Sequence, residues 1–237
     1  MTNAAAKEER PARVEAAVGL LAFGAGAMDA LSFVALGQVF TSAMTGNAVL
    51  LGLSIGQGRL AAASRSVAAL AGFLAGASVA CRPLIGVSRG AWSRGVIAGF
   101  AIEAGFLALF AGLLAALGRG GDALPIVLIL LAAAGMGAQS VLARHLNMPG
   151  IITTVFTGTL VDIVATLAGL DSQTGEGRTV PYRTGREIAA FVLYTAGAAA
   201  GGGIALLGAW IAGLIPLAAV LCALAIRPAI PQPAARE

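Results

Sequence analysis

The sequence contains few of the residues from which most catalytic and metal-binding sites are made. It has one histidine, His145, and two cysteines, Cys81 and Cys222, each alone in an apolar segment. A disulfide framework or a zinc site needs several such residues at close spacing, so neither is expected. No phosphate-binding Gly-Lys-Ser/Thr loop and no complete dinucleotide loop occurs. We therefore expect neither an enzyme nor a bound cofactor or metal.

Charged residues are also scarce, at 11% of the chain against 58% hydrophobic residues, and the mean hydropathy is +0.90. A typical soluble domain carries about 25% charged residues. A helix needs about 20 apolar residues to cross the hydrocarbon core of a bilayer, which is roughly 30 Å thick. The sequence therefore predicts an integral membrane protein in contact with the lipid bilayer.

Short patches of Gly, Arg, Pro and Ser divide the chain into apolar segments. These segments cover residues 15–36, 38–57, 65–86, 95–117, 123–146, 150–170, 187–206 and 208–226. A run such as Ile126 to Leu131 is apolar on every face, whereas a transmembrane β-barrel needs alternation over about ten residues. We expect an all-α, polytopic transmembrane helical bundle of six to eight spans. The basic N-terminus resembles that of a signal peptide, but a later copy of the first segment indicates that this segment is retained.

The formal net charge of +4 does not indicate nucleic-acid binding, because the basic residues lie between the apolar segments. With eight crossings and a cytoplasmic N-terminus, eleven Lys and Arg residues lie inside and four outside. If the second and sixth segments dip in and return to the same side, the counts are twelve and three. Both counts predict a multi-pass protein of the bacterial inner membrane with both termini cytoplasmic. Neither chooses between six and eight crossings.

Three blocks of the sequence recur in the same order. The block TSAMTGN, from Thr41, is similar to TTVFTGT, from Thr153, at an offset of 112 residues. Upstream a Gly-x-Gly pair recurs at an offset of 111, and downstream the stretch beginning at Arg65 recurs from Arg186 at an offset of 121. We predict two internally repeated halves between two polar cytoplasmic tails. The four parts are residues 1–14, 15–117, 118–227 and 228–237.

The number of crossings in each half decides how the halves are related. Four crossings would relate them by an axis along the membrane normal, whereas three crossings and a re-entrant segment would invert the second half. Inverted repeats with interrupted helices are typical of transporters, and Gly46 and Gly158 lie where such a break could occur. Glycine is equally typical of close helix packing. Pairs such as Gly72 with Gly76 suit contacts within the chain or between copies in a homo-oligomer.

Several motifs resemble the YoaK family of bacterial multi-span membrane proteins, which has no settled function. In the first half these are GAMDALSF from Gly26, Leu36-Gly37 and MTGN from Met44, and in the second half MGAQ from Met136, Arg144, Leu146 and TGT from Thr157. Where the family usually has Asn after the Gln, this chain has Ser140. The resemblance covers nearly the whole chain outside the tails, and it implies a fold and a location rather than an activity.

Ionisable residues within the apolar segments are candidates for function. A charge near the bilayer centre costs roughly 2.5–3.5 kcal/mol and normally faces a cavity or a partner. Asp29, Glu103 and Asp162 lie well inside apolar segments. We predict a polar site between the two halves that binds a small polar or ionic solute. The expected lining is Asp29, Thr45, Gly46, Asn47, Gln139, Ser140, Arg144, Thr157, Gly158, Thr159 and Asp162.

These residues fit two classes of protein. In a transporter or channel, an aspartate would be the ion or proton partner and Arg144 its counter-charge or an anion ligand. In a non-transporting scaffold or assembly protein, Arg144 would form a salt bridge with Asp29 or Asp162 that only joins helices. A water-accessible cavity reaching an aspartate would favour transport, and a dry, fully paired core would favour the scaffold. Glu103 fits either a site role or a neutral carboxyl packed between helices.

Overall fold

The computed structural model describes residues 3–90, 92–118, 124–147 and 180–227, with positions 160, 161, 164, 165 and 168. Within these residues the protein is helical and has no strand. The helices are α1 (Asn3–Ala35), α2 (Met44–Gly56), α3 (Leu60–Cys81), α4 (Arg94–Leu117), α5 (Leu124–His145), α7 (Val180–Leu207) and α8 (Ala209–Ile226), and a 3-10 turn, η1 (Arg82–Leu84), follows α3.

Six of the described helices, α1, α3, α4, α5, α7 and α8, are long and apolar enough to cross a membrane. The predicted all-α transmembrane bundle is thereby confirmed. The apolar segment at 38–57 differs from the others, because its helix, α2, begins only at Met44 and has 13 residues. At 1.5 Å per residue α2 is about 20 Å long, which is too short to cross the hydrocarbon core. Most of the segment at 150–170 lies outside the described residues.

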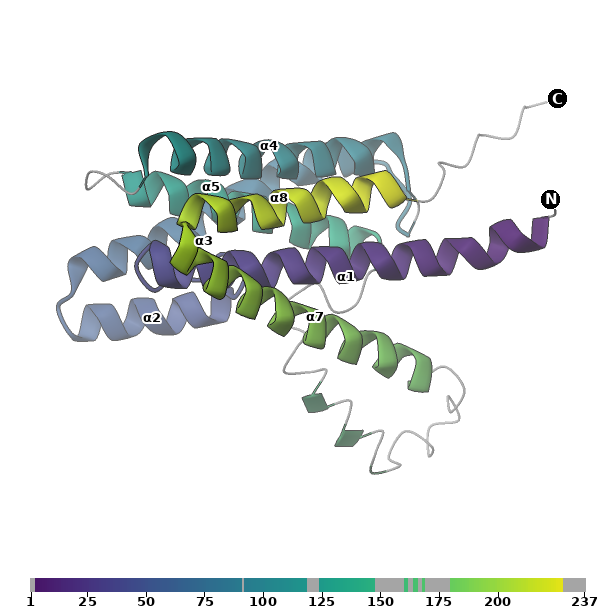
Figure 1. Ribbon diagram of the computed structural model, residues 1–237, viewed down its shortest axis with the longest axis horizontal. Helices are drawn as coiled ribbons and strands as arrows, with labels where there is room; N and C mark the ends of the chain where they lie inside the picture. The colour runs from purple at the N-terminus through teal and green to yellow at the C-terminus, as the bar shows by residue number, and fades with distance from the viewer. Residues whose placement is uncertain are drawn as a thin grey trace.

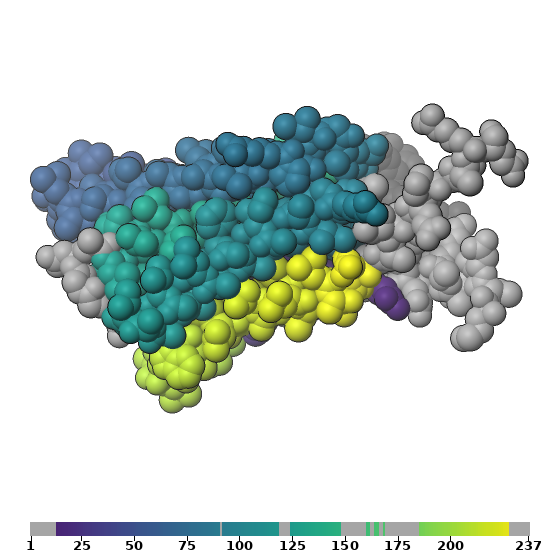
Figure 2. Space-filling model, turned by 90° about the horizontal axis from the view of Figure 1, so that it is seen from above, coloured from purple at the N-terminus to yellow at the C-terminus, as the bar shows by residue number. Residues whose placement is uncertain are grey.

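The helices α1, α4, α5 and α8 run along the long axis of the molecule, and α7 crosses α1 at an angle (Figure 1). The N-terminus of α1 and the end of α8 lie at the same end, as an even number of crossings requires. The turn between α2 and α3 lies at the opposite end (Figure 1). On the face seen from above, α4 lies between α3 and α8 (Figure 2). Outward-facing side chains such as Val49, Leu74 and Leu109 are more than half exposed and apolar, as a lipid-facing surface requires.

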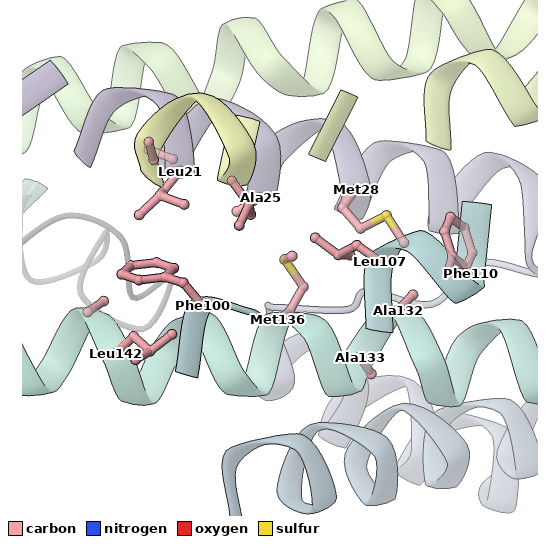
Figure 3. Close-up of a cluster of buried hydrophobic side chains, with 14 of the residues drawn as sticks. Leu21, Ala25, Met28, Phe100, Leu107, Phe110, Ala132, Ala133, Met136 and Leu142 are labelled. Atoms are coloured by element: carbon pink, nitrogen blue, oxygen red, sulfur yellow. The ribbon is translucent and has the colours of Figure 1, made fainter. Parts of the chain in front are cut away.

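The core lies where α1, α4 and α5 meet. Buried side chains from all three helices point toward one another there (Figure 3), among them Leu21, Ala25 and Met28 of α1, Phe100, Leu107 and Phe110 of α4, and Ala132, Met136 and Leu142 of α5. Lipid tails are as apolar as these side chains, so close fit rather than exclusion of water favours this packing.

Glycines bring two pairs of helices into backbone contact. A Cβ at Gly26 of α1 would collide with the carbonyl oxygen of Tyr194 on α7, and one at Gly137 of α5 would collide with that of Phe73 on α3. Gly76 and Gly197 make similar contacts, with the carbonyl oxygens of Ala134 and Phe23. Because any larger residue would separate the backbones, these positions require glycine. The contacts lie within the chain.

Candidate functional site

The connection between α1 and α2, residues 36–43, is an irregular segment that turns back along α1. It begins with two residues of positive φ, Gly37 at 96° and Gln38 at 62°. Thr41 is fully buried and Ser42 nearly so. Backbone groups buried at membrane depth need hydrogen-bond partners, because neither lipid nor bulk water supplies them there. The partners come from two side chains on the flanking helices, Asp29 and Asn47.

Asp29 lies on α1, is 2% exposed and accepts five hydrogen bonds. Oδ1 accepts from the backbone N–H of Thr41 at 2.6 Å, from the Thr41 hydroxyl at 2.8 Å and from the backbone N–H of Ser42 at 2.8 Å. Oδ2 accepts from the Ser42 hydroxyl at 2.6 Å. These donors directly precede α2, so the carboxylate also lies at the partly positive N-terminal end of that helix.

The fifth donor comes from a distant part of the chain. The Tyr194 hydroxyl of α7 donates to Oδ2 of Asp29 at 2.6 Å, across 165 residues of sequence. Each oxygen of an ionised carboxylate offers about two lone-pair positions, so three donors at Oδ1 and two at Oδ2 leave none vacant. A bound solute could therefore reach the Asp29 oxygens only after a donor withdraws. Tyr194 is the donor that belongs to another long helix.

Asn47 holds the same connection from the other side. It is fully buried one turn into α2, where Oδ1 accepts from the backbone N–H of Phe40 at 2.9 Å and Nδ2 donates to the Phe40 carbonyl at 2.6 Å. The Phe40 ring stacks on Phe33 with a centroid distance of 5.2 Å. A Cβ at Gly46 would lie 3.0 Å from that ring. The Met-Thr-Gly-Asn motif thus fixes the shape of the break before α2.

The predicted residues of α5 do not join the Asp29 cluster, which Asp29 forms with Thr41, Ser42 and Tyr194. Gln139 is buried and donates to the Leu21 carbonyl of α1 at 3.0 Å, which ties α5 to α1. The Ser140 hydroxyl donates to the Met136 carbonyl of its own helix at 2.9 Å. Arg144 is exposed in the last turn of α5, and the partners of Asp29 are hydroxyl and amide groups. The expected Asp29–Arg144 salt bridge is therefore not formed in this structure.

Comparison with known proteins places the chain in a family. A family model described as "Protein of unknown function (DUF1275)" matches residues 17–226. The chain belongs to this family. It is also similar to the UPF0700 transmembrane protein YoaK of Bacillus subtilis (strain 168), with 34% identity over 182 residues, 76% of this chain and 79% of the relative. No solved structure matches. The resemblance drawn from the motifs is confirmed, and the membrane location with it.

In this DUF1275 member the structure brings together only some of the predicted site residues. Asp29 and Asn47 both bond to the α1–α2 connection, whereas Thr45 is exposed on the first turn of α2. Four further predicted residues, Thr157, Gly158, Thr159 and Asp162, lie outside the described residues. Their role in binding stays a prediction.

Sequence reasoning missed three residues of the cluster, Thr41, Ser42 and Tyr194. Thr41 and Ser42 belong to the repeated block, but nothing in the sequence shows that they point at a carboxylate 12 or 13 residues away. Tyr194 is one of only two tyrosines in an apolar chain. A phenol in a membrane span needs a partner for its hydroxyl, and that requirement was the available signal.

Glu103 remains apart from this cluster. It is fully buried on α4, and neither carboxylate oxygen has a hydrogen-bond partner among the described residues. On the same helix, Gly99 packs on Leu142 and Leu107 packs on Gly135, which puts Glu103 level with the middle of α5. An isolated ionised carboxylate would be costly in such surroundings. This arrangement agrees with a neutral carboxyl between helices.

Proposed function

We propose that this protein moves a small polar or ionic solute across the bacterial inner membrane, with a site at the α1–α2 break. The interrupted segment carries the proposal. A short helix begins at Met44, and the buried Thr41 and Ser42 hydroxyls, bonded to the Asp29 carboxylate, lie directly before its N-terminus. Short helices whose ends and irregular backbone surround polar groups inside the bilayer are typical of secondary transporters.

An inverted internal repeat is the second part of the proposal. The glycine contacts support it, because they form two pairs related by the offsets found in the sequence. Gly26–Tyr194 corresponds to Gly137–Phe73, and Phe23–Gly197 corresponds to Ala134–Gly76, at offsets of 111 residues for α1 with α5 and 121 for α3 with α7. With three long helices and one short segment in each half, the second half would be inverted relative to the first.

The two halves differ at the hydrogen-bonded pair of Asp29 and Tyr194. Asp29 corresponds to Ser140 at an offset of 111, and Tyr194 corresponds to Phe73 at an offset of 121. Carboxylate and phenol are therefore both replaced in the other half, where no such hydrogen bond can form. This supports a single asymmetric site rather than two equivalent ones.

The mechanism we propose is a change between closed and open arrangements of the halves. In the closed arrangement Tyr194 and Ser42 occupy the two acceptor positions of Asp29 Oδ2. Movement of α7 relative to α1 would withdraw the phenol and release one of these positions for a cationic or hydrogen-bond-donating solute. The Thr41 and Ser42 donors, which belong to the same half as Asp29, would stay in place.

A ligand screen tests this function. Purified protein in detergent is heated in the presence of ions and small metabolites, and a solute that binds the folded state raises the unfolding temperature. We expect at least one cationic or donor-rich solute to do so in the native protein, and expect the Asp29→Asn protein not to respond. A screen without any stabilising solute, or a response that persists in Asp29→Asn, would count against the site.

A second function, a membrane scaffold, is favoured by one observation. Asp29 and Asn47 are both buried and both fully engaged with the protein's own groups. In a scaffold these bonds would only fix the bundle, and the site would stay dry in every state. Access of water to the Asp29 cluster therefore distinguishes the two functions.

A further inference from the structure

We propose that a second pocket, at the turn between α2 and α3, binds a phosphate group. The pocket has a volume of about 310 Å³, within the range of roughly 300–1,000 Å³ typical of small-ligand sites. It lies between the α1–α2 connection, the end of α2 and the first turns of α3. The residues that line it and carry the argument are Arg59, Arg65, Ser54, Ser66 and Gly37.

Arg65 is the first reason. It lies five residues into α3, about 8 Å along a helix that is long and apolar enough to span the membrane. An arginine at such a depth normally has a partner. Its Nε is buried without a hydrogen-bond partner among the described residues. The connection is shaped to admit this side chain, because a Cβ at Gly37 would lie 2.6 Å from that Nε.

Charge compensation is the second reason. Between Asp29 and Glu103 the sequence has no acidic residue, although it includes both arginines of the pocket. Arg186, which aligns with Arg65 at an offset of 121, has an acidic neighbour, since its Nε lies 3.9 Å from Glu15. Among the residues that the structure describes, Arg65 has no carboxylate at ion-pair distance, whereas its counterpart Arg186 has one. An anionic ligand would supply the missing counter-charge.

The hydroxyls of the pocket are the third reason. Ser54 is 3% exposed and Ser66 is 1% exposed, and both line the pocket. Among the described residues neither hydroxyl forms a hydrogen bond with a protein group. No side chain caps the first turn of α3, where the N–H groups of Leu60, Ala62 and Ala63 donate to the carbonyls of Gly58 and Arg59 and that of Ala61 remains available. Guanidinium groups, hydroxyls and backbone N–H groups at a helix N-terminus are donors that bind phosphate oxygens.

Two sources can supply a phosphate group here, the headgroup of an anionic phospholipid or a free phosphate. The pocket lies at the end of the bundle where α2 meets α3, opposite the chain termini (Figure 1), where a headgroup and the aqueous phase both have access. The proposal stands on different residues from the transport site, so either could fail alone.

The experiment compares anions on the full-length, delipidated protein in an uncharged detergent. Thermal unfolding is measured with sodium phosphate against sodium chloride at equal ionic strength, and with short-chain phosphatidylglycerol against phosphatidylcholine. Stabilisation by phosphate identifies a free phosphate as a ligand, and stabilisation by phosphatidylglycerol alone identifies a lipid headgroup. Both outcomes support the site.

Variants locate the effect. Arg65→Gln should weaken the stabilising anion at least about tenfold, because it removes a charged donor to the phosphate. Arg59 is exposed, so Arg59→Gln keeps the fold and should also weaken binding even if Arg65→Gln does not fold. Arg89→Gln, an exposed arginine at the other end of the bundle, is the matched control and should bind normally. Equal stabilisation by all four compounds, or full binding in both pocket variants, would overturn the proposal.

Discussion

At the scale of single residues, Asp29 organises the site because its carboxylate only accepts hydrogen bonds and every neighbour donates. Four donors come from Thr41 and Ser42, and the fifth comes from Tyr194. A hydrogen bond to a charged group contributes about 1.5–3 kcal/mol when both partners are present. The Asp29–Tyr194 bond is the one that joins α1 to α7, so it couples the cluster to the packing of a distant segment.

A double-mutant cycle measures that coupling. Tyr194→Phe removes one donor and should lower the free energy of unfolding by about 1.5–3 kcal/mol. Asp29→Asn should lower the free energy of unfolding by at least as much, because the NH₂ group of the new amide would point at neighbours that are themselves donors. The double variant should lose less than the sum of the two. Additive losses in detergent unfolding would mean that the two side chains do not interact.

Arg144 provides the contrasting case. The sequence allowed it to be the partner of Asp29, but it is exposed at the end of α5. Arg144→Gln should therefore change the free energy of unfolding by no more than about 0.5 kcal/mol, the usual range for an exposed position. A loss of several kcal/mol in the same unfolding assay would restore the ion pair as an explanation.

At the scale of elements, the sequence predicted the long helices, and for the second segment it left a broken or re-entrant helix open beside an ordinary closely packed one. The apolar runs fix the long helices because the bilayer sets their length. The segment at 38–57 carries no charge and is mostly apolar, yet residues 38–43 are not helical. Their backbone is held by Asp29 and Asn47, and such contacts between residues apart in the chain leave no mark in hydropathy. The hydrogen bond between Tyr194 and Asp29 joins residues 165 positions apart, so the sequence gives even less indication of it.

Glycine substitutions test the helix contacts. Gly26→Ala places a methyl group against the fixed carbonyl of Tyr194, so α1 and α7 must separate, at a cost of about 1–3 kcal/mol. Gly46→Ala meets only the movable ring of Phe40 and should cost less. Gly52→Ala, with open space around it, is the control and should be neutral or slightly stabilising, because alanine favours the helix more than glycine does. Equal unfolding temperatures for Gly26→Ala and Gly52→Ala would contradict the contact.

At the scale of the whole molecule, six crossings and a short α2 give a definite arrangement of loops. We expect cytoplasmic termini, a cytoplasmic α3–α4 connection and an α2–α3 turn on the other side, because that arrangement places twelve of the fifteen basic residues inside. Eight crossings would exchange the sides of the two connections. The arrangement is therefore open to a direct test.

Two cysteines in a background without Cys81 and Cys222 report on this topology. Gln57→Cys lies in the α2–α3 turn and Arg89→Cys in the α3–α4 connection, and both positions are exposed. A membrane-impermeant thiol reagent added to intact cells should label Gln57→Cys and leave Arg89→Cys unlabelled. The reverse pattern would establish eight crossings.

Access of water to the Asp29 cluster is the most direct test of the transport account. In the same background, Ser42→Cys places a thiol beside Asp29 at a position that is only 8% exposed. Leu60→Cys is the exposed control, and Leu31→Cys is the buried one. A transporter that opens should let an impermeant reagent reach Ser42→Cys more slowly than Leu60→Cys but measurably faster than Leu31→Cys. If Ser42→Cys stays as unreactive as Leu31→Cys, the cluster is a permanently dry scaffold and the transport account is wrong.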